Sequence, residues 1–232
     1  MSTGIILLCI LGAAIQACFI AVEHKEKYVG AVCLKGSASI VFVIIGAIAF
    51  AAAAEAQAVK PYLLSAKPVF IGLILGAVGD ILLNLRFVFE KQGQKIFLLG
   101  IAAFLAGHIL YLAALIPHSR NLLTCVIIGA VIAAAILAYI FKTMDVKPAF
   151  KAFGILYIGA VVIMTAIAVG NLISTPATTT WLYAVGAVLF TVSDVVLIFN
   201  TFGETTRFSL RITNLSLYYL GQLLIACSLF YI

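Results

Sequence analysis

Residues 72–84 read GLILGAVGDILLN, and residues 186–198 read GAVLFTVSDVVLI. Each stretch belongs to an apolar run long enough to cross a bilayer, and each carries one aspartate, Asp80 or Asp194. A charged side chain at the centre of a bilayer costs at least about 2.5 kcal/mol, so it is retained mainly where it faces a protein interior and has a function. The two aspartates are therefore the first candidates for a functional site.

The rest of the chain has the composition of a polytopic membrane protein. Of its 232 residues, 65% are hydrophobic and 9% are charged, which excludes an ordinary soluble domain. Apolar runs of about 17–22 residues predict eight transmembrane helices. We expect an all-α fold with a single transmembrane domain over residues 1–232. The eight spans are placed at residues 4–22, 36–54, 68–85, 96–116, 122–141, 152–173, 181–200 and 212–232.

The basic residues predict the orientation in the membrane. Eleven of the fourteen fall in the first, third, fifth and seventh connections. Short loops rich in Lys and Arg stay on the cytoplasmic side, so both termini are expected outside or in the lumen. The membrane would be the plasma (inner) membrane in a bacterium or the endoplasmic reticulum in a eukaryote. The net charge of +6 is then explained by topology, with the lipid bilayer as partner and no nucleic acid. The sequence carries no signal of oligomeric state.

An internal duplication is suggested by comparing the chain with itself. A shift of 114 residues superposes polar and small residues of the third and fourth spans on those of the seventh and eighth. This pattern predicts a parallel four-plus-four repeat, with halves of about 1–116 and 117–232. The superposed residues are Gly72, Gly79, Asp80 and Leu83 on Gly186, Ser193, Asp194 and Leu197, then Phe104, Gly107 and His108 on Tyr218, Gly221 and Gln222.

Helical spacing places further polar residues beside the aspartates. Asn84 follows Asp80 by one turn, and the fourth and eighth spans contribute His108, Tyr111, Tyr218 and Gln222. For the histidine, the glutamine and the tyrosines, a structural role in joining helices remains an alternative. For the aspartates we favour function, because an apolar or amide residue would pack at a lower desolvation cost.

A metal site of Asp80, Asp194 and His108 is a further alternative. His108 is the one histidine within the predicted spans, and no second ligand follows it at i+3 or i+4. We therefore expect no metal and no cofactor.

Two lysines are expected near the same boundary as the aspartates. Lys35 and Lys151 superpose on each other at a shift close to the 114 residues of the duplication, and each lies just before a predicted span. Asp80 lies six residues before Arg86, about 9 Å inside the membrane at 1.5 Å per residue. Two ammonium groups above two carboxyl groups would suit an amphiphile with a phosphate at one end and a reactive bond below it. The alternative is that both lysines are ordinary anchors that extend to the interface.

Four motifs, in order and spacing, resemble the lysoplasmalogenase-like (YhhN) membrane family over roughly residues 30–230. They are GxxGDxxL from Gly76, FxxGxxxFxxxHxxY from Phe97, GAxLFxxSD from Gly186 and YYxxQLxI from Tyr218. The resemblance implies a membrane enzyme whose substrate is a lysophospholipid, lysoplasmenyl-ethanolamine or lysoplasmenyl-choline. It would cleave the vinyl ether bond to a fatty aldehyde and a glycerophospho-base. The candidates carried over are Lys35, Asp80, His108, Ser193, Asp194, Tyr218 and Gln222.

The chain departs from the pattern of some relatives at two places. Asn200 stands where some carry an acid, and Gly36-Ser37 stands where some have a proline shortly after the lysine.

The chemistry of a vinyl ether also fits two carboxyl groups. Protonation of carbon leaves an oxocarbenium-like centre that water attacks, a demand that glycosidases meet with a similar pair. Asp80 has few polar neighbours in sequence, whereas Asp194 has Ser193 beside it, so we expect Asp80 to be the acid and Asp194 the carboxylate. His108 or Gln222 would hold the water. The remaining candidates for substrate binding are Lys35, Lys151, Asn84, Tyr111, Ser193 and Tyr218.

Two other classes of function stay open. A proton- or cation-coupled transporter of a small molecule or lipid would use the paired aspartates between its two repeats. A membrane scaffold or receptor without catalysis would tolerate replacement of both aspartates.

Overall fold

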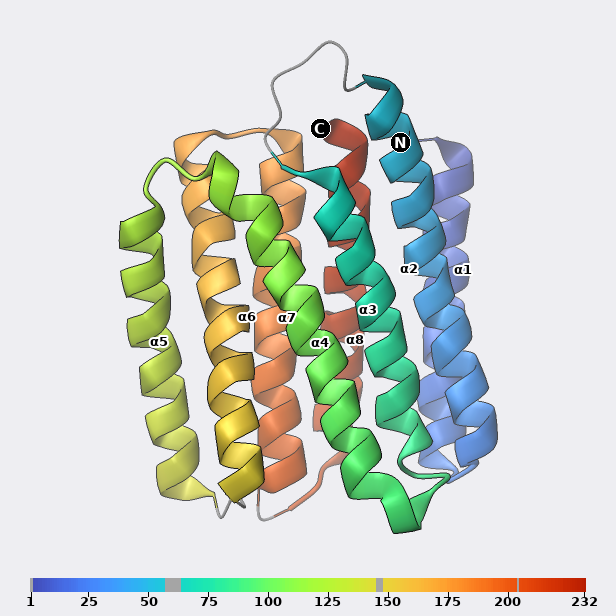
Figure 1. The fold of residues 1–232 in the computed structure, drawn as a ribbon. Coiled ribbons are helices and arrows are strands. Elements are labelled where there is room, and N and C mark those ends of the chain that lie inside the picture. The colour runs from blue at the N-terminus through green and yellow to red at the C-terminus, as the bar shows by residue number, and fades with distance from the viewer. Residues whose placement is uncertain (1, 57–63, 145–147, 204) are drawn as a thin grey trace.

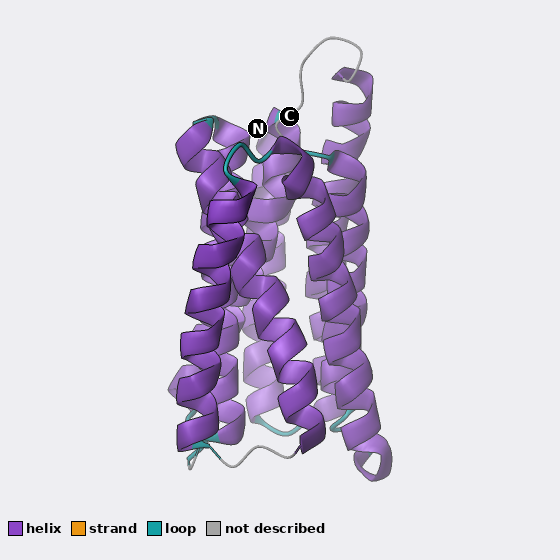
Figure 2. Cartoon of the chain, turned by 60° about the vertical axis from the view of Figure 1, so that its left-hand side comes forward, coloured by secondary structure: helices purple, strands orange, loops and turns teal. Residues whose placement is uncertain are grey.

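The computed structural model describes residues 2–56, 64–144, 148–203 and 205–232. Within these ranges the chain forms eight α-helices, each long and apolar enough to cross a membrane, and no strand (Figures 1 and 2). The expectation of an all-α protein with eight spans is confirmed. The helices are α1 (Thr3–His24), α2 (Tyr28–Ala56), α3 (Ala66–Leu85), α4 (Gly93–Leu115), α5 (Leu122–Thr143), α6 (Pro148–Ser174), α7 (Thr178–Phe202) and α8 (Phe208–Ser228).

Most helix ends lie within a few residues of the predicted ones, but the start of α2 does not. The prediction began the second span at residue 36, whereas α2 begins at Tyr28. Lys35 therefore lies about two turns inside the helix, away from its end. This difference decides the environment of Lys35.

The prolines mark helix ends. Pro68 lies in the first turn of α3, Pro148 is the first residue of α6, and Pro176 precedes α7. A proline lacks a backbone N–H but is tolerated in a first turn, where that group has no partner within the helix. Each described span is consequently one continuous helix, the form in which a chain satisfies its backbone hydrogen bonds inside a bilayer.

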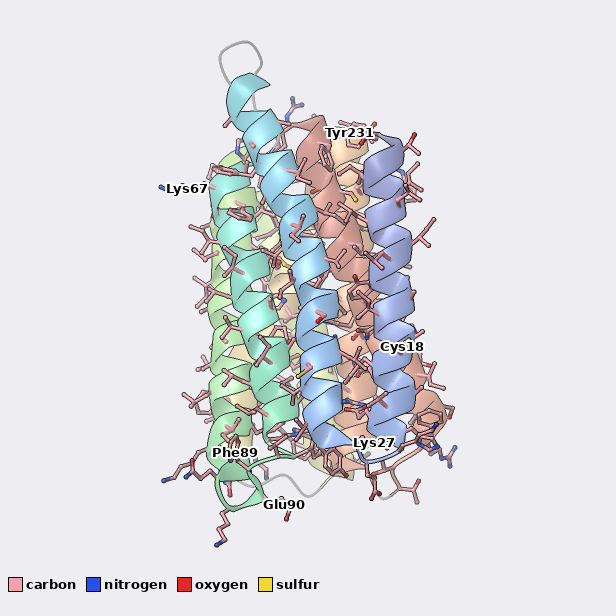
Figure 3. All side chains as sticks on the ribbon, turned by 90° about the vertical axis from the view of Figure 1, so that its right-hand side faces the viewer. Cys18, Lys27, Lys67, Phe89, Glu90 and Tyr231 are labelled. Atoms are coloured by element: carbon pink, nitrogen blue, oxygen red, sulfur yellow. The ribbon has the colours of Figure 1, made fainter. Side chains whose placement is uncertain are left out.

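The helices form a bundle with both termini at the same end (Figure 1). Helix α3 packs along α4 and α7 packs along α8, while α2 contacts α1, α3 and α8, and α6 contacts α5, α4 and α7. Lys27 and Glu90 lie at the end opposite the termini, and Tyr231 lies near the termini (Figure 3). The end with Lys27 is the one that the basic residues predict to be cytoplasmic.

A pair of glycines lies at each of the two main helix crossings, that of α3 with α4 and that of α7 with α8. A Cβ atom on Gly72 of α3 would lie 3.1 Å from the carbonyl oxygen of Gly107 in α4. A Cβ on Gly186 of α7 would lie 2.8 Å from the carbonyl oxygen of Gly221 in α8. The absence of side chains therefore lets each pair of backbones touch. These glycines are the ones superposed by the predicted duplication, which itself stays a prediction.

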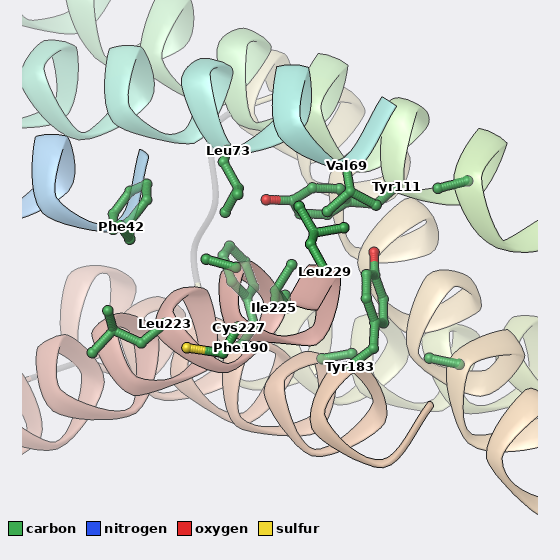
Figure 4. Close-up of a cluster of buried hydrophobic side chains, with 14 of the residues drawn as sticks. Phe42, Val69, Leu73, Tyr111, Tyr183, Phe190, Leu223, Ile225, Cys227 and Leu229 are labelled. Carbon is green, nitrogen blue, oxygen red and sulfur yellow. The ribbon is translucent and has the colours of Figure 1, made fainter. Parts of the chain in front are cut away.

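The core lies where α3, α7 and α8 meet. Leu73, Phe190 and Ile225 from these three helices are fully buried together (Figure 4). The outer helix α5 instead exposes apolar side chains such as Leu123 and Val131. Exposed apolar surface of this kind suits contact with lipid.

Candidate active site

Asp80 is buried at the centre of a polar cluster made by three helices. Its Oδ2 accepts hydrogen bonds from the hydroxyls of Ser39 on α2, at 2.5 Å, and Tyr218 on α8, at 2.7 Å. Its Oδ1 lies 3.4 Å from Nζ of Lys35. Two hydroxyl donors and an ammonium group all favour the ionised carboxylate.

Lys35 is held inside the bundle instead of reaching the surface. Only 1% of the residue is exposed. Its ammonium donates to Oε1 of Gln16 on α1, at 3.4 Å, and lies 4.4 Å from the centre of the Tyr218 ring. The expectation that Lys35 stands at headgroup level is therefore wrong, because α2 starts two turns earlier than predicted.

A chain of hydrogen bonds leads from Asp80 along α8. Nε2 of Gln222 donates to the hydroxyl of Tyr218 at 3.4 Å, and Tyr111 on α4 donates to Oε1 of Gln222 at 3.1 Å. Five of the predicted residues, Lys35, Asp80, Tyr218, Gln222 and Tyr111, thus belong to one network, in which Tyr111 and Gln222 are farther from the carboxylate than Tyr218. Asn84 also lies beside Asp80, but its amide donates to the Asp80 backbone carbonyl, at 2.9 Å.

Asp194 has a sparser environment than Asp80. Its Oδ2 accepts a hydrogen bond from Tyr157 on α6, at 2.6 Å. The neighbouring Ser193 is directed elsewhere, since its hydroxyl and its backbone carbonyl both accept from the Asn214 amide, at 2.9 and 3.0 Å. Each aspartate thus accepts a hydrogen bond from the helix that precedes its own, Ser39 of α2 for Asp80 and Tyr157 of α6 for Asp194.

These contacts reverse the expected distribution of donors. The sequence suggested that Asp194 has more donors, because Ser193 is next to it. In the structure Asp80 has two hydroxyls and Lys35 as donors, whereas among the described residues Asp194 accepts a hydrogen bond from Tyr157 alone. Donors from other helices outweigh those on the same helix.

His108 is enclosed by aromatic rings. Its Nδ1 lies 2.7 Å from the Phe104 carbonyl oxygen, which marks it as the protonated nitrogen. The ring centre is 4.7 Å from that of Phe190 and 5.5 Å from that of Tyr157. Its buried Nε2 has no hydrogen-bond partner among the described residues. Nor do three or more His, Cys, Asp or Glu side chains gather in a metal-binding group in the described part of the chain.

Both aspartates line one cavity, of about 120 Å³, at the end of the bundle opposite the termini. One buried water needs roughly 10–15 Å³, so the cavity has room for water and a small polar group. Apolar side chains from α4, α5, α6 and α7 make up much of the lining, including Ile101, Ile140, Ile158 and Leu197. The polar and charged side chains at this cavity are those of Lys35, Asp80, Asn84, Arg86, Tyr157, Asp194, Thr201, Arg211, Asn214 and Tyr218.

The predicted site residues form two groups, and Lys151 stands apart from both. Lys35, Asp80, Asn84, Asp194 and Tyr218 line the cavity. His108, Tyr111, Ser193 and Gln222 are buried behind that lining, where they support it. Lys151 is half-buried near the start of α6, with its ammonium 5.7 Å from the centre of the Phe141 ring.

Several residues of the site were missed by the sequence reasoning. Ser39 and Tyr157 carry hydroxyls in apolar spans, a signal of the kind that singled out Tyr111 and Tyr218. Arg86 and Arg211 were counted only as topology signals. Asn214 gave no pattern, since its partner Ser193 lies on another helix.

Comparisons with known proteins place these residues in a wider context. The sequence model of the YhhN family matches residues 37–229, a range that includes both aspartates and begins two residues after Lys35. The lysoplasmalogenase TMEM86A of Bos taurus is 29% identical to the chain over 167 residues. The alignment covers 71% of this chain and 65% of the bovine protein, slightly less than two-thirds of that relative. No solved structure matches the chain.

Proposed function

This chain belongs to the YhhN family, and on that premise we propose that it is a membrane hydrolase that cleaves the vinyl ether bond of a lysoplasmalogen. The products would be a fatty aldehyde and a glycerophospho-base. The observation that carries the proposal is the pair of aspartates on one cavity, with three charged or hydroxyl partners on Asp80 and a tyrosine on Asp194.

Unequal surroundings give the two carboxyl groups different tasks. Lys35, Ser39 and Tyr218 keep Asp80 ionised, whereas Asp194 has an apolar environment and one tyrosine donor, so it is the better candidate to hold a proton. We therefore assign Asp194 as the acid and Asp80 as the carboxylate, the reverse of the assignment from sequence.

The reaction proceeds by proton transfer to carbon. Asp194 donates its proton to the vinyl carbon remote from the ether oxygen, and the adjacent carbon becomes an oxocarbenium centre. Asp80 stabilises this cation and accepts a proton from the water that attacks it. The resulting hemiacetal breaks its carbon–oxygen bond to give the aldehyde and the glycerol hydroxyl. A positioned acid or base of this kind contributes typically about 10²–10⁴-fold.

Asn84 is a candidate contact for the substrate's glycerol. The residue lines the cavity, and its Oδ1 is buried with no hydrogen-bond partner among the described residues. Asn84 lies one turn from Asp80 toward the end of α3, where the second glycerol carbon would lie if the vinyl ether meets the aspartates. The free hydroxyl of a lysolipid on that carbon would supply the missing donor.

The transporter alternative is supported less well. In the transporters built from paired repeats, substrate sites are typically formed by discontinuous helices near the bilayer midplane. Each described span here is one continuous helix, and the cavity lies toward one end of the bundle.

Turnover of lysoplasmenyl-ethanolamine by the purified protein in detergent tests the proposal. In heavy water, the aldehyde must carry deuterium on the carbon next to its carbonyl, because that carbon receives the proton. The saturated alkyl ether analogue should not be cleaved. An aldehyde released without the label, after correction for enolisation, would contradict protonation of carbon, and absence of turnover would contradict the hydrolase itself.

A further inference from the structure

Arg86 lines the cavity and lies directly after α3. Its guanidinium carbon is 4.6 Å from the centre of the Phe87 ring and 4.4 Å from that of the Phe97 ring, so two aromatic rings hold the group in place. Its Nε is buried and donates to no described residue. An oriented guanidinium with an unused buried donor is a ready partner for an anion.

A second arginine, Arg211, lines the same cavity. Arg211 of α8 donates from Nε and from Nη2 to the two carboxylate oxygens of Glu23, at 2.9 and 2.5 Å. This two-bond ion pair joins α8 to α1, and the Glu23 carboxylate offsets the charge of Arg211. The structure gives Arg86 no such carboxylate partner among the described residues.

The charge on Arg86 persists in this setting. Burial lowers the pKa of Arg86 to about 10, with the nearby positive charge of Arg211 acting in the same direction. The group is still cationic at neutral pH. Arg86 and Arg211 carry two positive charges against the one negative charge of Glu23, so this part of the cavity attracts a further negative charge.

The spacing along α3 fits one amphiphile. Asp80 and Arg86 are six residues apart, about 9 Å along the axis at 1.5 Å per residue. In a lysoplasmalogen about six bonds separate the carbon that becomes the oxocarbenium centre, which Asp80 stabilises, from phosphorus, and an extended chain advances roughly 1.2 Å per bond, or about 7 Å. The two lengths differ by about 2 Å, which the long side chain of Arg86 can cover, and Asn84 lies between their ends.

We infer that Arg86, with Arg211 beside it, forms an anion subsite that binds the phosphodiester of the lipid while its ether bond lies at Asp80 and Asp194. The inference rests on the proposed function for the identity of the ether lipid, but the subsite itself requires only a phosphate on a glycerol ether. Lys35 and Lys151, the sequence-based candidates for this task, are respectively paired with Asp80 and outside the described cavity lining.

Equilibrium binding separates the subsite from catalysis. The probes are a 1-O-alkyl lysophosphatidylethanolamine, which has no vinyl bond to cleave, the matching 1-O-alkylglycerol without phosphate, and inorganic phosphate. Binding is measured by titration calorimetry on the purified chain in detergent. The variants are Arg86→Gln, Arg86→Lys and, as a matched control, Arg120→Gln, which removes an exposed arginine at the opposite end of the bundle.

Arg86→Gln should weaken binding of the phospholipid about tenfold to a hundredfold, the range expected for hydrogen bonds to a charged group. Binding of the alkylglycerol should not change, which also shows that the variant is folded. The affinity of Arg86→Lys for the phospholipid should fall between those of Arg86→Gln and the parent, since lysine keeps the charge but lacks the several N–H donors of a guanidinium. The affinity of Arg120→Gln should equal that of the parent.

Equal losses for the phospholipid and the alkylglycerol would overturn the subsite, as would an unchanged affinity for both. Inorganic phosphate that binds as tightly as the phospholipid would overturn the lipid assignment in favour of a free-phosphate site. Failure of vinyl ether turnover would contradict the proposed function without altering any of these binding results.

Discussion

Replacing Lys35 with methionine tests the buried ion pair with Asp80. The side chains are 1% and 5% exposed and their charged atoms lie 3.4 Å apart. Removal of one partner of a buried pair typically costs about 3–5 kcal/mol, because the other charge remains buried without compensation. Asp80 keeps the hydroxyls of Ser39 and Tyr218 as donors, so we expect a value near the lower end, about 3 kcal/mol.

Thermal unfolding in detergent measures this cost. In a domain of this size each kcal/mol shifts the midpoint by about 2–4 °C, so Lys35→Met should lower it by about 6–12 °C. The fraction of protein that remains monodisperse after heating, read by gel filtration, gives the midpoint. Lys151→Met is the matched control, because its ammonium is half-buried near Phe141, and it should shift the midpoint by less than about 2 °C.

A double variant decides whether the two charges act on each other. Lys35→Met with Asp80→Asn removes both, so most of the lost stability should return, with a coupling energy of about 2–3 kcal/mol. If the two losses simply add, or if Lys35→Met alone leaves the midpoint within 2 °C of the parent, the ion pair does not exist in the folded protein. Lys35 would then return to its sequence-based role at the phosphate.

Further predictions concern catalysis, selectivity and packing. Asp80→Asn and Asp194→Asn should each lower vinyl ether hydrolysis by at least about a hundredfold while the protein stays folded, and near-normal turnover would remove that residue from the mechanism. A preformed hemiacetal needs no carbon protonation, so its breakdown should survive Asp194→Asn better than Asp80→Asn, and the opposite order would restore the sequence-based roles. Asn84→Leu should reduce the preference for a lysolipid over its 2-deoxy analogue by about tenfold to a hundredfold in kcat/KM, and an unchanged preference would free Asn84 from the glycerol hydroxyl. Gly186→Ala should cost about 1–3 kcal/mol in thermal unfolding, because its Cβ would meet the Gly221 carbonyl, whereas Gly159→Ala on α6 has open space and should stabilise by up to about 1 kcal/mol.

The sequence predicted what depends on composition and local spacing. Apolar runs and prolines yielded eight helices, and the intramembrane aspartates singled out two of the helices that line the cavity, α3 and α7. The start of α2 was missed because Tyr28 to Leu34 follow a cluster of charges and resemble a loop continuing from it. That one error moved Lys35 from the interior to the interface.

Contacts between helices could not be derived from one sequence. The tyrosine beside Asp194 comes from α6, and the serine beside Asp80 comes from α2. Neither residue stands at a helical interval in the sequence from the aspartate that it contacts. Counting neighbours along α3 and α7 therefore gave the wrong order of donors. The arginines were visible, but a positive charge in a short loop is explained by topology before any other role is considered.

The depth of the aspartates determines what the substrate must do to react. Asp80 lies six residues before Arg86 and Asp194 lies eight before Phe202, about 9 and 12 Å from these helix ends at 1.5 Å per residue, so under the proposed function the ether bond of a lysolipid would meet them while its tail remains among apolar side chains. Withdrawal of that tail into water would cost about 0.8 kcal/mol per methylene, an obstacle that grows with every carbon. Under the proposed function the tail never enters water, so this cost does not arise. The rate should accordingly follow the mole fraction of substrate in the two-dimensional lipid phase, and dilution of the substrate with inert lipid should slow turnover even when the total amount of substrate is held constant.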